Sequence, residues 1–284
     1  MRMTKHRMGT ILAGTWVQMQ KPYYQGVAAE LAFFFLISII PLFIVLAELL
    51  GIFSISADML RDWIETYVDD ELVQSVLGFF DYTSSGTTNV IFLLFALWAA
   101  SKAQFSLIRI ANYTYTGRTV GNGYFRERLR SILTVLLPLL LLIFAFLVLF
   151  YGGAAAGVLD FYAGRLLHAE ASFLQRLWSL LRWPLAIAVY FAAISLIYYL
   201  LPTKRWKFRE ELPGAVLASA GMLLVTGCYS FYLTHFSNYD VLYGSLAAVV
   251  GLIMWFYFLG FVLVIGIVFN AVVKEVGDID LQRK

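Results

Sequence analysis

Four ionisable side chains lie inside long apolar stretches of the sequence: Lys102, Arg109, Glu30 and Glu48. Ionisable residues within membrane spans are costly to bury and are functional candidates by default. If their two helices run in opposite directions, Glu30 and Arg109 fall at similar depths and are expected to form an ion pair. Glu48 lies about five helical turns beyond Glu30, and Lys102 is about 18 Å from Glu48 in depth. Lys102 is therefore left to contact carbonyls, water or an anionic substrate.

Lys102, Ser106, Arg109 and Tyr113 fall on one stripe of a helix that turns by about 100° per residue. This stripe is expected to face protein or water rather than lipid. Two interpretations stay open: a role in a substrate pathway, or structural pairing with the charged ends reaching towards water. The candidate substrate or pathway residues are Lys102, Ser106, Arg109, Glu30 and Glu48.

The elements that position these residues are predicted to be membrane-spanning helices. Hydrophobic residues make up 61% of the chain and charged residues 14%, against roughly 45–50% and 25% in soluble domains. A bilayer core about 30 Å thick requires roughly 20 apolar residues per helix. Six stretches are long enough, which predicts one all-α, polytopic transmembrane bundle over residues 1–284. The predicted spans are 27–53, 90–111, 132–156, 183–201, 212–233 and 241–272.

Basic residues gather on one side of these spans, in the N-terminal segment, the loops after the second and fourth spans, and the tail. The positive-inside rule places these segments, and with them both termini, in the cytoplasm. No cleavable signal peptide is expected, and residues 8–20 suggest a short helix on the membrane surface. Small residues such as Gly214, Gly221 and Gly266 predict close helix packing.

The outer loop at 54–88 is acidic and has apolar residues at helical spacing. It predicts an amphipathic helical hairpin that either caps the bundle or forms a vestibule attracting cations. A second outer connection joins the last two spans. Its residues Tyr239, Tyr243, Gly244 and Ser245 are expected to fix the geometry of that hairpin rather than to touch substrate.

Sequence motifs for catalysis are missing. His6, His168 and His235 are far apart, Cys228 is the one cysteine, and no HExxH or phosphate-binding loop is found. We therefore expect no enzymatic activity, no metal and no cofactor. Topology accounts for the basic residues, so no nucleic-acid partner is implied.

Several segments resemble the YihY/virulence factor BrkB family of bacterial inner-membrane proteins, some of which once carried the label ribonuclease BN. The matching segments are AAELAFF at 28–34, LWAAS at 97–101, LPTK at 201–204, LPGA at 212–215 and YGSLAA at 243–248. The resemblance extends over nearly the whole chain and implies a multi-pass protein of the bacterial inner membrane. It brings no established substrate or catalytic residues.

Two functions fit these features, and a third fits them less well. The first is a transporter or flippase of a lipid or small anionic solute, favoured by embedded charges and by proline-interrupted spans. The second is a non-transporting envelope scaffold or assembly factor that docks a partner through the acidic outer hairpin. A membrane-bound enzyme is the third, with the ribonuclease label disfavoured. The lipid bilayer is the expected partner, and the sequence does not indicate an oligomeric state.

Overall fold

The structure is a computed structural model that describes residues 5–52, 86–119, 123–167, 173–203, 206–235 and 245–282. Within these ranges every regular element is a helix, which confirms the predicted all-α class. The helices are α1 (Lys5–Met19), α2 (Pro22–Ile52), α5 (Gly86–Thr116), α6 (Tyr124–Leu167), α7 (Phe173–Leu200), α8 (Phe208–His235) and α10 (Ser245–Gln282).

Five helices in the described part of the chain are long and apolar enough to cross a membrane. These segments are Val90–Thr116, Tyr124–Ala145, Arg176–Leu200, Phe208–Tyr232 and Val249–Gly277. The first predicted span corresponds to α2, a 31-residue helix whose side chains are described only up to residue 38. The count of six spans stays a prediction, as does the outer helical loop, because residues 53–85 lie outside the described ranges.

The helices extend beyond the predicted spans because helical hydrogen bonding continues past the apolar residues. The third predicted span, 132–156, lies within α6, which has 44 residues and is therefore about 66 Å long. Defined signals end or start helices elsewhere. Gly117 closes α5 with a φ of 70°, and its amide donates to the Tyr113 carbonyl at 2.8 Å. Gly123 has a φ of 92° directly before α6.

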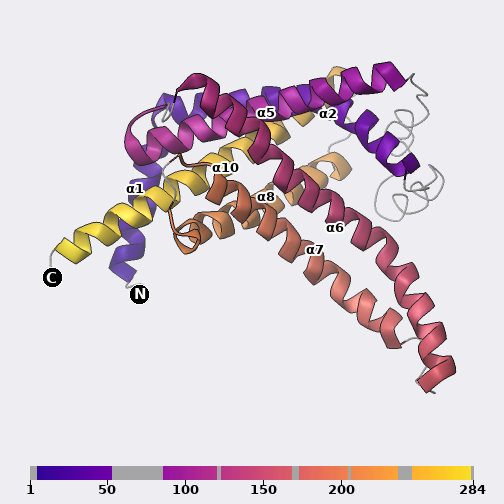
Figure 1. The fold of residues 1–284 in the computed structure, drawn as a ribbon. Coiled ribbons are helices and arrows are strands. Elements are labelled where there is room, and N and C mark those ends of the chain that lie inside the picture. Colours follow the sequence, from indigo (N-terminus) through magenta and orange to yellow (C-terminus); the bar gives the residue numbers. More distant parts are fainter. Residues whose placement is uncertain are drawn as a thin grey trace.

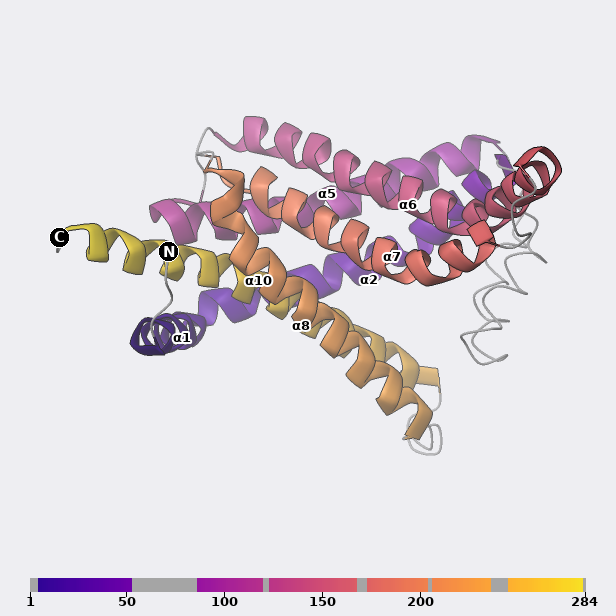
Figure 2. The ribbon, with the colours of Figure 1, turned by 90° about the horizontal axis from the view of Figure 1, so that it is seen from below.

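Both chain termini lie at one end of the molecule, together with the α5–α6 and α7–α8 connections (Figure 1). We call this the terminal end, and we call the other the opposite end. The α6–α7 pair and the α8–α10 pair meet at the terminal end and diverge towards the opposite end in both views (Figures 1 and 2). The bundle is therefore joined at one end and splayed at the other.

The hydrophobic core extends from the terminal end into the bundle. Its fully buried side chains come from six helices and include Ile11, Tyr24, Leu31, Ile108, Tyr198 and Val264. About half of the apolar window of α5 and of α10 is buried, compared with 17% in α7. Exposed leucines and aromatics cover the outer part of α7, which suits a helix surrounded by lipid.

Helix α1 lies across the terminal end, and Figure 2 views it nearly along its axis while the long helices run across the view. It packs mainly on α10, and a Cβ added at Gly14 would come within 3.0 Å of Val272. Ile11, Thr15 and Met19 are buried, whereas Leu12, Trp16 and Val17 are exposed. The helix predicted at 8–20 is therefore present, with one apolar stripe packed and another uncovered.

Two glycines allow α8 and α10 to approach closely near the terminal end. A Cβ added at Gly214 would overlap the Gly266 carbonyl oxygen, and one at Gly266 would overlap the Tyr198 hydroxyl. A Cβ at Gly221 would meet Val262 at 2.8 Å. The sequence prediction of close packing through small residues is confirmed at these three positions.

Candidate functional site

The predicted charge stripe on α5 faces α2. Both Glu30 carboxylate oxygens accept hydrogen bonds from Arg109 Nη2 at 2.6 Å, which confirms the predicted ion pair. The two side chains are 34% and 31% exposed, so the pair is only partly screened from its surroundings. Arg109 also donates to Ser106 Oγ at 3.4 Å, and Ser106 donates to the Lys102 carbonyl at 3.2 Å. The stripe is thus a connected structural feature.

A cluster of aromatic rings lies near this ion pair. The Tyr113 ring lies 4.8 Å from the Tyr23 ring and 6.3 Å from the Tyr24 ring. Burial raises the pKa of the Tyr23 phenol, and the nearby Arg109 charge acts in the opposite direction. Tyr23 therefore lies close enough to the Arg109–Glu30 pair to interact with both charges.

Lys102 is not part of that pair. Its ammonium lies over the Trp98 ring, 5.7 Å from the centroid, and the side chain is half-buried. No carboxylate whose side chain the structure describes lies within ion-pair distance of it. An ammonium over an indole face is stabilised by the ring's electrons, so this contact accounts for Lys102 without a substrate.

The side chains of the remaining predicted site residues lie outside the described part of the structure. Glu48 belongs to α2 and Ser245 begins α10, but their side chains lie outside the described part. Tyr239, Tyr243 and Gly244 lie outside the described ranges altogether. Their predicted roles stay predictions.

At the terminal end, Arg130 of α6 holds the α7–α8 connection, a feature that the sequence analysis missed. Its Nη2 donates to the carbonyls of Leu200 and Pro202, and its Nη1 donates to Thr203 Oγ1 at 3.2 Å. The buried Glu127 carboxylate lies 3.4 Å from Arg130 Nη1 and accepts the Thr203 hydroxyl at 2.6 Å. We call these residues the arginine clasp.

The clasp is tied to α5 as well. Asn112 Oδ1 accepts the backbone amide of Thr203 at 2.9 Å. The first three residues of the LPTK segment at 201–204 form this turn. One side chain from α5 and two from α6 hold the turn in place. The terminal end is closed on the α6–α7 side by this set of bonds.

A second polar cluster closes the α8–α10 side and centres on Glu211, which is 3% exposed. Its Oε2 accepts Tyr115 Oη at 2.9 Å and Asn270 Nδ2 at 3.0 Å. Asn270 also donates to the Glu211 carbonyl at 3.0 Å and accepts the Gly214 amide at 2.6 Å. This Glu211 cluster joins α5, α8 and α10. Sequence reasoning missed it because Glu211 stands at a span border, where acidic residues commonly start helices.

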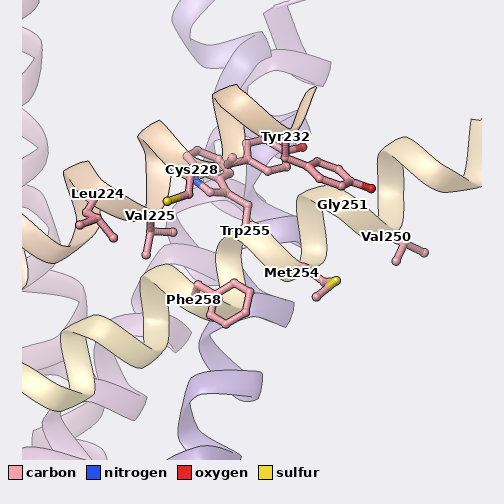
Figure 3. Close-up of a pocket in the computed structure, with 10 residues that line it drawn as sticks. Leu224, Val225, Cys228, Tyr232, Val250, Gly251, Met254, Trp255 and Phe258 are labelled. Carbon is pink, nitrogen blue, oxygen red and sulfur yellow. The ribbon is translucent and has the colours of Figure 1, made fainter. Parts of the chain in front are cut away.

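An apolar cavity of about 800 Å³ lies between α8 and α10, in the halves of these helices nearer the opposite end (Figure 3). The Tyr229 and Trp255 rings stack across it with centroids 5.4 Å apart. Its walls are almost entirely carbon, and none of the charged stripe residues lines it. The lining residues are Leu224, Val225, Cys228, Tyr229, Tyr232, Val250, Gly251, Met254, Trp255 and Phe258.

No group of histidine, cysteine and carboxylate side chains suited to a metal occurs in the part of the chain that the structure describes. The five long apolar helices define a polytopic helical membrane protein, and the cavity is an exposed apolar surface between two of them.

Comparison with known proteins places the chain in a family. It belongs to the virulence factor BrkB family, which it matches over residues 15–284. The putative ribonuclease-like protein YfkH of Bacillus subtilis (strain 168) is 29% identical over 254 residues, covering 88% of this chain and 90% of the relative. The resemblance to this family seen in the sequence is confirmed.

Shorter matches join the chain to proteins described as membrane proteins. A UPF0761 membrane protein of Idiomarina loihiensis is 34% identical over 97 residues, covering 34% of each chain. A UPF0761 membrane protein of Xanthomonas campestris pv. campestris (strain B100) is 42% identical over 76 residues, 26% of this chain and 18% of the relative. No solved structure matches the chain.

Proposed function

We propose that this protein moves an amphipathic lipid across the membrane, with the α8–α10 cavity as the acyl-chain site. The cavity is the observation that carries the proposal. It lies within two membrane-spanning segments, has a volume of about 800 Å³, is open on one side and is lined by apolar side chains. A sugar or small ion would require several convergent hydrogen-bonding groups, whereas an acyl chain requires only apolar surface.

The overall arrangement supports the same proposal. Hydrogen-bonded clusters hold the terminal end closed, while the helix pairs diverge at the opposite end (Figures 1 and 2). A carrier that alternates between two states needs its helix pairs held together at one end while they separate at the other. The charged stripe plays no part in the route proposed here, because Arg109 is paired with Glu30 and Lys102 lies over Trp98.

The test is lipid exchange in liposomes that contain the purified protein. Fluorescent phospholipids in both leaflets are exposed to a reducing anion that quenches only the outer leaflet. Protein-free liposomes lose about half of their signal, and a lipid-moving protein exposes the rest. Retention of the inner-leaflet signal in protein-containing liposomes contradicts the proposal.

A matched pair of variants locates the route. Gly251 lines the cavity, and a Cβ there meets the Tyr229 ring at an ordinary 3.6 Å, so Gly251→Leu fills the cavity without a backbone clash. Gly227 lies outside the lining, with nothing within 4 Å of an added Cβ. Gly251→Leu is expected to slow lipid exchange several-fold while Gly227→Leu leaves it unchanged. Equal rates in the two variants contradict the cavity assignment.

We also propose that the terminal end faces the cytoplasm, in an inner membrane. Exposed basic residues of the described part, including Arg118, Lys207 and Arg209, lie there, as the positive-inside rule requires. With Cys228 replaced by Ser, a cysteine introduced at Arg118 should react with a membrane-impermeant maleimide only after the cells are opened. Reaction in intact cells contradicts this orientation.

Nuclease activity is not part of the proposed function, although the name of YfkH includes ribonuclease-like. Purified protein incubated with precursor tRNA and divalent metal should leave the RNA intact. Cleavage that copurifies with the chain contradicts this part of the proposal.

A further inference from the structure

Three carboxylates of the described helices differ in burial and in their partners: Glu30 is half-buried, whereas Glu127 and Glu211 are buried. Glu30 is paired with Arg109 at 2.6 Å, and Glu127 is paired with Arg130 at 3.4 Å. Glu211 is 3% exposed, and no lysine or arginine of the described residues lies within ion-pair distance of its carboxyl group. Its hydrogen-bond partners are the neutral groups of Tyr115 and Asn270.

This difference determines which form of each carboxyl group is stable. A carboxylate taken out of water needs an opposite charge, and the buried Glu127 has one in Arg130. Glu211 would lose its hydration with only two neutral donors in return. A protonated Glu211 avoids that loss and still accepts both hydrogen bonds at Oε2, with the proton carried by Oε1.

The charged and titratable groups around Glu211 come from four helices. They are Tyr115 on α5, Tyr198 on α7, Glu210 on α8 and Lys274 on α10. Lys274 Nζ lies 3.4 Å from Glu210 Oε2, so the ammonium is already paired with the exposed Glu210 carboxylate. Tyr198 donates its hydroxyl to the Leu263 carbonyl at 2.6 Å and does not contact the carboxyl group.

Glu211 also occupies a mechanically important position. The Asn270 side chain is hydrogen-bonded to the Glu211 carboxyl group, the Glu211 carbonyl and the Gly214 amide. These bonds lie where α8 and α10 approach closely. Tyr115 extends the same cluster to α5. A change of charge at this carboxyl group therefore acts directly on the joint that closes the terminal end.

We propose that Glu211 binds a proton and that this proton keeps the terminal end closed. When the O–H bond breaks, the proton passes to water and a buried carboxylate is left behind. That charge draws water into the joint, and the entering water separates α8 from α5 and α10. The inference rests on the proposed function, because it supplies proton coupling to the opening that lipid movement requires.

Infrared spectroscopy of the full-length protein in lipid nanodiscs tests protonation. A protonated carboxyl group gives a C=O stretching band that a carboxylate lacks. In difference spectra between acidic and alkaline samples, which cancel the ester carbonyl band of the lipids, the wild type is expected to show this band, and Glu211→Gln should remove it. Glu127→Gln is the matched control and should retain it, because Glu127 is paired with Arg130. A wild type without the band, or an unchanged band in Glu211→Gln, overturns the proposal.

Distance measurement tests the coupling. Spin labels on cysteines introduced at the exposed Arg118 and Lys207, in a Cys228→Ser background, report the separation of the α5 and α8 ends. Raising the pH should shift the distance distribution to longer values in the otherwise wild-type chain and leave Glu211→Gln in its short distribution. A pH-independent distance, or the same shift in Glu211→Gln, overturns the proposal. Neither measurement involves lipid exchange, so a failure of the proposed function is seen separately.

Discussion

The close approach of α8 and α10 at Gly214 makes a sharp prediction about stability. An alanine there would place its Cβ against the Gly266 carbonyl oxygen and 2.6 Å from Asn270 Cγ. Backbone cannot yield as a flexible side chain does, so the two helices must separate. Forced overpacking of this kind costs about 1–3 kcal/mol.

Two smaller terms modify that cost. Separation weakens the bond from the Gly214 amide to Asn270, now 2.6 Å long, at a cost of about 0.5–1.5 kcal/mol. Replacing glycine by alanine inside a helix stabilises the folded protein by roughly 0.5–1 kcal/mol. The net expectation for Gly214→Ala is a loss of about 2 kcal/mol, which lowers the melting temperature by about 4–8 °C.

Gly227→Ala in the same helix is the control, because nothing lies within 4 Å of an added Cβ there. This variant receives only the helix-propensity gain and should melt at or slightly above the wild type. Thermal unfolding in nanodiscs can be followed by the fluorescence of the seven tryptophans. If Gly214→Ala melts as high as Gly227→Ala, the argument from close helix packing is wrong.

Three further outcomes follow from the polar contacts. Arg109→Gln should destabilise the protein by about 1–3 kcal/mol because it leaves Glu30 without its partner, and adding Glu30→Gln should recover part of this in a double-mutant cycle; additive losses contradict the ion pair. Arg130→Lys should lower the melting temperature nearly as much as Arg130→Ala, since an ammonium cannot reproduce the fork of donors that holds the connection; full stability of the lysine variant contradicts the clasp. Tyr198→Phe should lose about 0.5–1.5 kcal/mol in the same unfolding assay, because the Leu263 carbonyl loses the hydroxyl it accepts; an unchanged melting temperature is the contrary result.

The sequence predicted the parts of this structure that depend on hydropathy and helical geometry. Apolar length located the helices, and a fixed rise per residue placed Glu30 and Arg109 at the same depth, where they are paired. Small residues correctly indicated the contacts at Gly214 and Gly266. The membrane class and the family could both be inferred before the fold was known.

The arginine clasp and the Glu211 cluster could not be inferred in this way. Arg130 lies in the loop after the second predicted span, where basic residues indicate membrane orientation. In the structure it donates hydrogen bonds to backbone carbonyls of the α7–α8 connection. Glu211 looks like an ordinary acid in the first turn of a helix. Both roles depend on which helices are lateral neighbours, and hydropathy carries no information about lateral order. For the same reason, the sequence did not predict the divergence of the helix pairs.

The position of α1 has a consequence for how the molecule is made. Synthesis runs from the N terminus, so α1 leaves the ribosome before its main packing partner, α10. Until α10 is inserted, Ile11 and Met19 lack the surface that buries them. The first helix must therefore wait at the membrane surface through the insertion of every other helix. Its docking against Val272 depends on the insertion of α10, and a protein that lacks α10 leaves the packed apolar stripe of α1 uncovered.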